Sequence, residues 1–361
     1  MKDYFQPLKF KCGAVMKNRF MLAPLTNTQS HQDGTLSDAE YNWLTMRARG
    51  GFGLTMTCAS HVQAGGKGFA GQLGCFSDDH LAGLERLASG IRKENSLAMV
   101  QLHHAGMRSP MEEINTQPVC PSDDAETGAR AMTQTEVEQL VEDFVSAACR
   151  VEEAGFDGVE IHAAHGYIIC QFLSSEINRR TDRYGGSLEN RSRVLFEIIA
   201  GIRRRCSPGF MLGVRLSPER FGMRLGEVIE VARHLLDGNQ IDFLDMSLWD
   251  SFKKPEDEKF GDRPLLDWFT ALDRGATRLG VAGMIRTPAD VRYCLDAGVD
   301  FVLLGRAAIL HYDYPLQVRA NPEFEPVSLP VSPQYLHAQG LGERFIEYMM
   351  RWDGFVQKRP G

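Results

Sequence analysis

The sequence has no long hydrophobic run, no signal peptide and no excess of positive charge. No apolar stretch approaches the roughly 18 residues that predict a membrane span. The net charge of −7 gives no electrostatic reason to expect nucleic acid or an acidic membrane as a partner. The first residues, MKDYFQPLKFKCG, lack the apolar core of a signal peptide. We therefore expect a cytoplasmic protein whose partners are small molecules.

The sequence also lacks clustered cysteines. Its eight cysteines are scattered and no CxxC pair occurs. This distribution excludes a recognisable zinc or iron–sulfur spacing and argues against a disulfide framework. We expect reduced thiols, most of them small core residues, and no metal site.

What the chain does have is a repeated alternation of short apolar runs and amphipathic segments. The clearest helix is predicted over 133–155, where Thr133 and Glu136 form a capping box. Segments 187–206 and 287–298 repeat the pattern. The apolar runs are continuous rather than alternating, which predicts parallel strands covered on both faces. These runs lie at 19–25, 52–58, 96–102, 157–162, 210–216, 242–247, 279–284 and 300–305.

Eight such units in about 300 residues favour a (β/α)8 TIM barrel, of class α/β, over a doubly wound sheet. The first segment alternates around Cys12 and is predicted to be a β-hairpin that closes the bottom of the barrel. No linker or low-complexity stretch divides the chain, so we predict one domain over 1–361. Its parts are the hairpin at 1–17, the barrel at 18–311 and a tail at 312–361. Longer excursions follow strands at about 60–78, 105–132 and 248–264.

Polar residues stand just past nearly every predicted strand end. Any one of them alone is a helix cap or a solvated side chain in most proteins. In an eight-stranded barrel, however, all these points converge on one mouth, where such barrels carry their chemistry. The residues are Thr26, Ser60, Gln101, His103, His104, His162, His165, Arg215, Ser247 and Arg306.

The last two strands indicate a phosphate site. Gly283 and Gly305 follow these strands, and each precedes a predicted helix. Backbone N–H groups at helix N-termini, together with Arg306, form a cradle for phosphate. A glycine in this position is also a simple turn, but two such loops with an arginine favour phosphate.

The stretch VEIHAAHGYIICQF places His162 and His165 three residues apart at a strand end. One interpretation is half of a metal site, but the neighbouring residues offer no carboxylate as a further ligand. The other is a pair of neutral imidazoles that donate N–H bonds to one oxygen and stabilise enolate-like charge. The residues modestly favour the second interpretation. Tyr167 is then either an acid or a packing residue.

These motifs together resemble the old yellow enzyme family, the FMN-dependent NAD(P)H:flavin oxidoreductases and ene-reductases. The most specific segment is HAAHGYIICQFLSSEINRRTDRYGGSLENRSR at 162–193. VQLHHAG at 100–106 and GVRLS at 213–217 fall at the expected spacings. The resemblance runs from NRFMLAPLT at 18–26 to FVLLGRAAI at 301–309, which is essentially the whole barrel.

The resemblance implies FMN as the cofactor, NADH or NADPH as the reductant and a ping-pong reaction. Hydride passes from NAD(P)H to the flavin and then to the β-carbon of an activated alkene, an α,β-unsaturated carbonyl compound or similar. His162 and His165 would hold the carbonyl oxygen, and Tyr167 would stand near the same pocket. Tyr167 is a candidate proton donor; a tyrosine of another loop and water are the alternatives. A homo-oligomer is possible in this family.

The resemblance also implies which residues hold FMN. Gln101 would bond the pyrimidine edge of the flavin, Arg215 would lie by N1 and O2, and Thr26 would lie near O4. The flavin would be lined by Pro24, Leu25 and Ala59. Its phosphate would be held by Gly283, Gly305 and Arg306, in agreement with the reading from the residues alone. The scattered cysteines leave FMN as the only redox centre that we expect.

Some positions depart from the family pattern. Thr26 replaces a redox-sensing cysteine of one bacterial branch, and Thr28 replaces that branch's substrate-pocket tyrosine. The tail contains Arg351, which could reach a neighbouring active site, although packing of the tail on its own barrel is favoured. Two alternative functions remain open: a metal-dependent barrel lyase or hydrolase that uses His162 and His165, and a non-catalytic flavin-binding protein.

Overall fold

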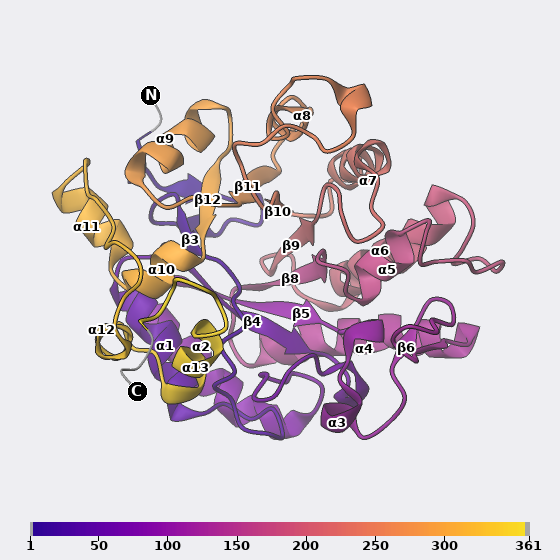
Figure 1. The fold of residues 1–361 in the computed structure, drawn as a ribbon. Coiled ribbons are helices and arrows are strands. Elements are labelled where there is room, and N and C mark those ends of the chain that lie inside the picture. Colours follow the sequence, from indigo (N-terminus) through magenta and orange to yellow (C-terminus); the bar gives the residue numbers. More distant parts are fainter. Residues whose placement is uncertain (1–2, 358–361) are drawn as a thin grey trace.

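The protein was analysed as a computed structural model, which describes residues 3–357. At its centre is a closed barrel of parallel strands in the order β10-β11-β12-β3-β4-β5-β8-β9 (Figure 1). The strands are β3 (Phe20–Leu22), β4 (Leu54–His61), β5 (Leu97–His103), β8 (Gly158–Ala163), β9 (Met211–Leu216), β10 (Phe243–Ser247), β11 (Arg278–Ala282) and β12 (Phe301–Leu304). All eight overlap the predicted runs, and the predicted (β/α)8 TIM barrel is confirmed.

Helices surround the barrel and cover the outer face of the strands (Figure 1). The capping box of Thr133 and Glu136 is present and starts α4 (Gln134–Glu153), whose Val137, Leu140 and Phe144 are buried. The other helices that lie between strands are α1 (Asp38–Arg49), α2 (Leu81–Lys93), α3 (Met111–Ile114), α5 (Ile168–Leu173), α6 (Leu188–Arg205), α7 (Leu225–Asp237), α8 (Asp267–Thr270) and α9 (Pro288–Asp296). In residues 3–357, no helix combines the length and the apolar character needed to cross a membrane.

The N-terminal hairpin closes one end of the barrel, as predicted. It consists of β1 (Leu8–Lys9) and β2 (Val15–Met16), paired antiparallel. Between them, the ring of Phe10 lies 6.0 Å from that of Phe243 and 6.1 Å from that of Phe301. These rings belong to an apolar cluster with methionines from several strands, so this end is filled and water is excluded from it.

A local irregularity in β4 brings two predicted site residues together. The register between β4 and β5 shifts after Met56, so that Ala59 becomes the partner of Gln101. An extra residue of this kind bends a strand and re-aims its side chains, and such bulges are frequent beside active sites.

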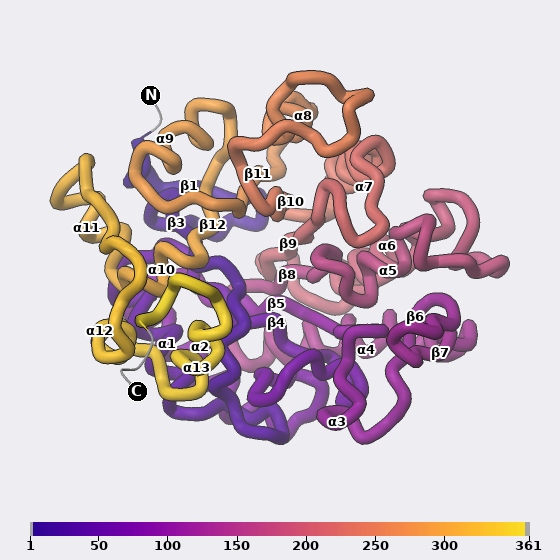
Figure 2. The backbone as a smooth tube through the Cα atoms, in the orientation of Figure 1, coloured from indigo at the N-terminus to yellow at the C-terminus, as the bar shows by residue number. Residues whose placement is uncertain are grey.

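The loop after β5 and the C-terminal tail contain elements that the sequence did not predict. The loop carries β6 (Val119–Cys120) and β7 (Arg130–Ala131), which pair with each other. After α10 (Arg306–Leu310) and α11 (Tyr314–Ala320), the tail forms α12 (Pro333–Ala338) and α13 (Glu343–Met349). Figure 2 shows this yellow segment folded back over the barrel beside α1 and α10. Phe345 of α13 packs edge-on against Trp43 of α1, with ring centres 4.8 Å apart. The tail therefore packs on its own barrel.

Candidate active site

A cavity of about 490 Å³ lies at the C-terminal ends of the strands, opposite the hairpin. We call it the mouth cavity. Most of the predicted site residues line it, namely Pro24, Leu25, Thr26, His165, Tyr167, Arg215, Gly283, Gly305 and Arg306. The remaining three, His162, Ala59 and Gln101, are not part of its lining. His162 and Gln101 are almost fully buried, and His162 contacts His165. Convergence of the strand ends thus gathers residues that are far apart in the sequence.

The two histidines of the strand-end motif form a linked pair. His162 Nε2 lies 3.3 Å from His165 Nδ1, and His165 Nε2 lies 2.8 Å from the hydroxyl of Ser247. His165 adopts a left-handed φ of 60°, and its backbone N–H donates to Ser217 Oγ, which turns its ring toward the cavity. Burial lowers the pKa of both imidazoles well below 6.5, and the neighbouring Arg215 and Arg108 lower it further. Both rings are therefore neutral at pH 7, with an N–H to donate.

Tyr167 lies against the same pair. Its ring centre is 5.2 Å from that of His162 and 4.3 Å from that of His103, and Arg108 stacks over it at 4.9 Å. Burial raises the pKa of Tyr167 above 10, so its phenol keeps its proton at neutral pH. The geometry therefore suits a protonated phenol that can give up a proton inside the cavity.

A buried network of charges lies behind Arg215. Arg215 Nε is 2.9 Å from Asp245 Oδ2, and its Nη2 donates to Ser247 Oγ at 3.3 Å. Nearby, Gln101 donates to Glu160 at 2.6 Å. Burial, helped by the charge of Asp245, raises the pKa of Glu160 to about 8; burial raises that of Asp245 to about 6 against the opposing effect of Arg215. Near neutral pH, the two buried carboxyl groups therefore favour a state in which only one of them is protonated.

Glu160 and Asp245 were missed in the sequence, although each leaves a signal there. Both are fully buried, and each interrupts an otherwise apolar strand, as the letters VEIH and DFLDMS show. A charge inside a buried strand rarely occurs without a partner. This signal indicates a polar network but not which residues complete it.

The opposite end of the mouth cavity fits a phosphate group. Gly283 has a φ of 153°, and a Cβ there would lie 3.0 Å from the backbone nitrogens of Asp250 and Ser251. Arg306 and Arg286 both line this end, and no ion pair involves either of them within residues 3–357. Burial, and after it the charge of Arg286, lowers the pKa of Arg306. Two neighbouring cations without a carboxylate are stabilised by a bound dianion, so these residues fit FMN.

Several lining residues were not among the predicted site residues. The C-terminal tail provides Tyr348, Met349 and Trp352, with Arg306 5.5 Å from the Trp352 ring. Phe221 and Trp249 also line the cavity, at left-handed φ angles of 55° and 66°. Such backbone conformations are costly for bulky residues and are concentrated at functional sites.

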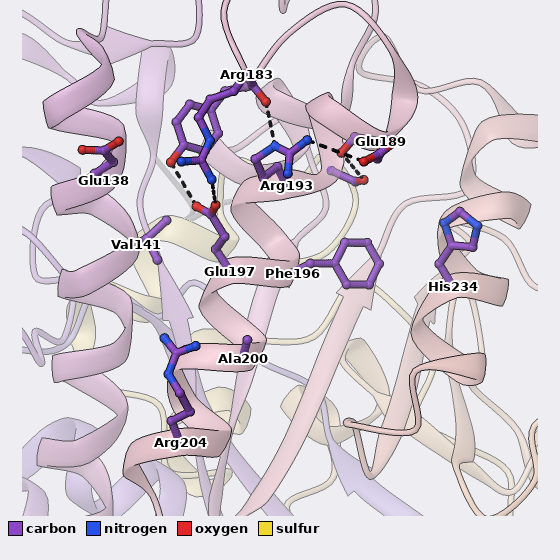
Figure 3. A pocket seen from close by; sticks show the side chains of 12 residues that line it. Glu138, Val141, Arg183, Glu189, Arg193, Phe196, Glu197, Ala200, Arg204 and His234 are labelled. Atoms are coloured by element: carbon purple, nitrogen blue, oxygen red, sulfur yellow. Dashed lines mark hydrogen bonds and ion pairs between the residues drawn. The ribbon is translucent and has the colours of Figure 1, made fainter.

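A second, larger cavity of about 740 Å³ lies on the outside of the barrel, between α4, α6 and α7 (Figure 3). We call it the outer groove. Its charged residues pair largely with one another: Arg183 bonds Glu197, and Arg193 lies 3.6 Å from Glu189. The hydroxyl of Tyr184 also donates to Glu197, at 3.0 Å. Its size alone therefore does not make it the reactive site.

The metal-site interpretation of His162 and His165 finds no further ligand. Across the described part of the chain, no group of three or more His, Cys, Asp or Glu is placed to hold a metal ion. Outside the pair, the His165 ring has the hydroxyl of Ser247 as its polar partner, and a hydroxyl is not a third ligand of the His, Cys or carboxylate kind.

Comparison with known proteins gives the family. Residues 3–321 match the model of the NADH:flavin oxidoreductase / NADH oxidase family. The chain belongs to this family. It is 35% identical over 333 residues to the probable NADH-dependent flavin oxidoreductase YqiG of Bacillus subtilis, with 89% of each chain covered. It is 32% identical to the NADH:fumarate oxidoreductase of Klebsiella pneumoniae, covering 96% of this chain but 39% of that protein.

Comparison with solved structures supports the same family. The solved old yellow enzyme homologue of Zymomonas mobilis superimposes with a TM-score of 0.79 at 27% identity, covering 93% of this chain and 96% of that one. The old yellow enzyme resemblance of the sequence is thereby confirmed. The protein is an oxidoreductase that uses FMN, with NADH or NADPH as reductant.

Proposed function

We propose that this oxidoreductase reduces activated alkenes. The reductant is oxidised, one hydride adds to the β-carbon of an α,β-unsaturated carbonyl compound or similar, and one proton adds to the α-carbon. The observation that carries the proposal is the neutral His162–His165 pair, in which His165 lines the mouth cavity and His162 is buried directly against it. The name of the Klebsiella relative, an NADH:fumarate oxidoreductase, supports an unsaturated substrate.

The histidine pair supplies electrostatic stabilisation of the reacting carbonyl. When hydride adds to the β-carbon, negative charge moves onto the carbonyl oxygen. His162 and His165 are fixed before this happens, by each other and by Ser247, so they need little reorganisation. A preorganised donor of this kind is worth roughly 2.7–4 kcal/mol in the transition state.

Bound FMN supplies the hydride chemistry, and the protein holds the cofactor and tunes its surroundings. We assign Arg306 with Gly283 and Gly305 to the phosphate, and Pro24, Leu25 and Ala59 to the walls of the flavin site. Thr26, Gln101 and Arg215 are assigned to the polar edge of the flavin. Arg215 is anchored by Asp245 at 2.9 Å, which fixes its positive charge at that edge.

We assign the proton at the α-carbon to Tyr167. Its phenol is protonated at neutral pH and lies beside His162, within the same cavity lining as His165. Arg108 stacks on the Tyr167 ring and stabilises the phenolate that remains after the transfer. Solvent then returns the proton through the open cavity.

The test is a stopped-flow experiment on each half-reaction. FMN-loaded protein should be bleached by NADH or NADPH, and the reduced protein should be reoxidised without oxygen by 2-cyclohexenone, with cyclohexanone as product. Bleaching without reoxidation by any of a panel of enones, nitroalkenes and unsaturated thioesters would favour the non-catalytic flavin-binding alternative. Protein that takes up no FMN but gains activity with a divalent metal would favour the lyase or hydrolase alternative.

A further inference from the structure

The charges that line the mouth cavity are of one sign. Four arginines face it, Arg108, Arg215, Arg286 and Arg306, and its lining contains no aspartate or glutamate. Three of these arginines have a partner or an assigned role, because Arg215 pairs with Asp245 and the other two belong to the phosphate end. Arg108 stacks on Tyr167, but it has no acidic partner and no assigned role in binding the substrate.

Arg108 is placed where the polarised end of a substrate would lie. It ends a short 3₁₀ turn, Gly106–Arg108, in the loop after β5, and it is exposed. Its Nη1 donates to the backbone oxygen of His165, and its guanidinium lies 4.9 Å from the centre of the Tyr167 ring. These contacts fix the cation between the two residues that we assign to the reacting carbonyl and its proton.

No carboxylate neutralises this cation. Within residues 3–357, Arg108 forms no ion pair, and the other hydrogen-bond donors of its guanidinium bond no acidic side chain. In the same loop, Glu113 lies 2.8 Å from Lys67, and Asp123 accepts a hydrogen bond from the backbone N–H of Ala131. A planar, fixed and uncompensated guanidinium matches the geometry of a carboxylate.

We propose that Arg108 binds a carboxylate on the substrate, so that the enzyme prefers α,β-unsaturated carboxylates over neutral enones. This inference rests on the proposed alkene reduction at the same site. The carboxylate that is conjugated with the alkene lies between the histidine pair and Arg108.

The preference has a physical reason. A carboxylate anion withdraws electrons poorly, so an alkene conjugated with it accepts hydride reluctantly. A guanidinium beside the carboxylate offsets its charge, and the neutral imidazoles take up the charge that develops during the reaction. Arg108 is thus a specificity-determining residue, and its effect on the dissociation constant should be confined to anionic ligands.

The test compares two ligands of nearly equal shape, trans-cinnamate and the neutral trans-cinnamamide. Each is titrated into oxidised, FMN-loaded enzyme, and binding is followed by the change in the visible absorbance of the flavin. In Arg108→Gln, the dissociation constant of cinnamate should rise about tenfold or more, as for loss of a charge-assisted contact, while that of cinnamamide should change less than about twofold. Arg108→Lys should recover part of the cinnamate affinity.

The matched control is Arg220→Gln. Arg220 also carries a positive charge near the mouth, 4.5 Å from the ring of Trp249, but it lies outside the cavity lining and 3.8 Å from Glu256. This variant should leave both dissociation constants unchanged. A second arm measures NADH and NADPH in the reductive half-reaction, because the phosphates of the reductant are the other source of anionic groups; their affinity should not depend on Arg108.

Any of four results would overturn the inference. Equal weakening of cinnamate and cinnamamide would show that Arg108 acts through its bond to His165. Unchanged cinnamate binding in Arg108→Gln, or no cinnamate binding by the unaltered enzyme, would show that no anion contact exists. Loss of NADPH affinity alone would assign Arg108 to the reductant. Turnover of 2-cyclohexenone distinguishes these results from failure of the proposed alkene reduction, since it does not require an anionic substrate.

Discussion

The outer groove and the mouth cavity differ in how their charges are arranged. The outer groove is the larger, about 740 Å³ against 490 Å³, and contains acidic and basic side chains that pair within it. The mouth cavity is lined by four arginines, no acidic side chain and His165, one member of the histidine pair that burial keeps neutral. Most charged side chains of the outer groove pair with one another and are therefore less available to a ligand. The comparison indicates that uncompensated charge, rather than volume, marks the site where this molecule reacts.

The largest expected effect is on the rate of reoxidation, when the histidine pair at the mouth cavity is removed. His162→Ala combined with His165→Ala should slow reoxidation of the reduced enzyme by 2-cyclohexenone at least 10²–10³-fold, the range seen on losing one such donor. FMN should stay bound. The measurement is anaerobic stopped-flow absorbance, with flavin content determined separately. His234→Ala, which removes a histidine from the outer groove, should match the unaltered enzyme. A double variant that reoxidises at the normal rate would contradict the assigned role.

Arginine substitutions in the two cavities should also differ in their effect on FMN affinity. Arg306→Gln removes one of the two uncompensated cations at the phosphate end, so FMN affinity should fall roughly 10–100-fold, or ~1.5–3 kcal/mol for bonds to a charged group. Apoprotein titrated with FMN and followed by flavin fluorescence gives the dissociation constant. Arg204→Gln in the outer groove should bind FMN as tightly as the unaltered protein. Similar losses in both variants would mean that the charge of the whole protein, and not the cradle, attracts FMN.

A smaller effect follows from the buried carboxyl behind Arg215. Glu160 has a pKa raised to about 8, so between its unfolded value, near 4.5, and pH 8 the folded protein binds more protons than the unfolded chain. Its contribution to stability is therefore present at low pH and is lost as the pH rises through this window, by up to ~1.4 kcal/mol per pH unit. Glu160→Gln should flatten the decline in melting temperature between pH 5 and 9. Parallel melting profiles for the two proteins would exclude a raised pKa.

The smallest effect is expected from the paired charges of the outer groove. Glu197→Gln weakens the contacts to Arg183 and to the hydroxyl of Tyr184 at a site that is half exposed. Surface pairs of this kind contribute roughly 0–1 kcal/mol, so thermal or urea unfolding should show a loss of no more than about 1 kcal/mol. Both half-reactions should be unaffected. A clear change in alkene turnover would mean that the outer groove is coupled to the mouth cavity. It would contradict the conclusion that only the mouth cavity takes part in the reaction.

The barrel was predictable because its signals are local. Each strand is a continuous apolar run, and α4 begins at the capping box of Thr133 and Glu136, which needs only four consecutive residues to form. Convergence of parallel strand ends then follows from the fold class, which explains why residues as distant as Pro24 and Arg306 could be assigned to one cavity.

The remaining features depend on contacts between distant segments. Nothing in the letters around Arg108 indicates that its side chain lines the cavity, and in the tail the resemblance pointed to Arg351 rather than to Trp352. A loop or tail is placed by the surfaces it meets. The partners of Glu160 and Arg215 likewise depend on how neighbouring strands are aligned, with Gln101 beside the former and Asp245 beside the latter. A strand pattern gives the face on which a residue lies, but not its cross-strand neighbour.

The tail of the chain has a consequence for how the enzyme is made. Tyr348, Met349 and Trp352 line the same cavity as Pro24 and Leu25, so the pocket joins residues from near both ends of the described chain. A chain grows from its N-terminus, and all eight strands are therefore complete before the last wall of the pocket exists. Until the tail docks, the mouth cavity of the nascent barrel stays open on one side and exposes its arginines to solvent. The pocket is therefore complete only once α13 has docked on the barrel.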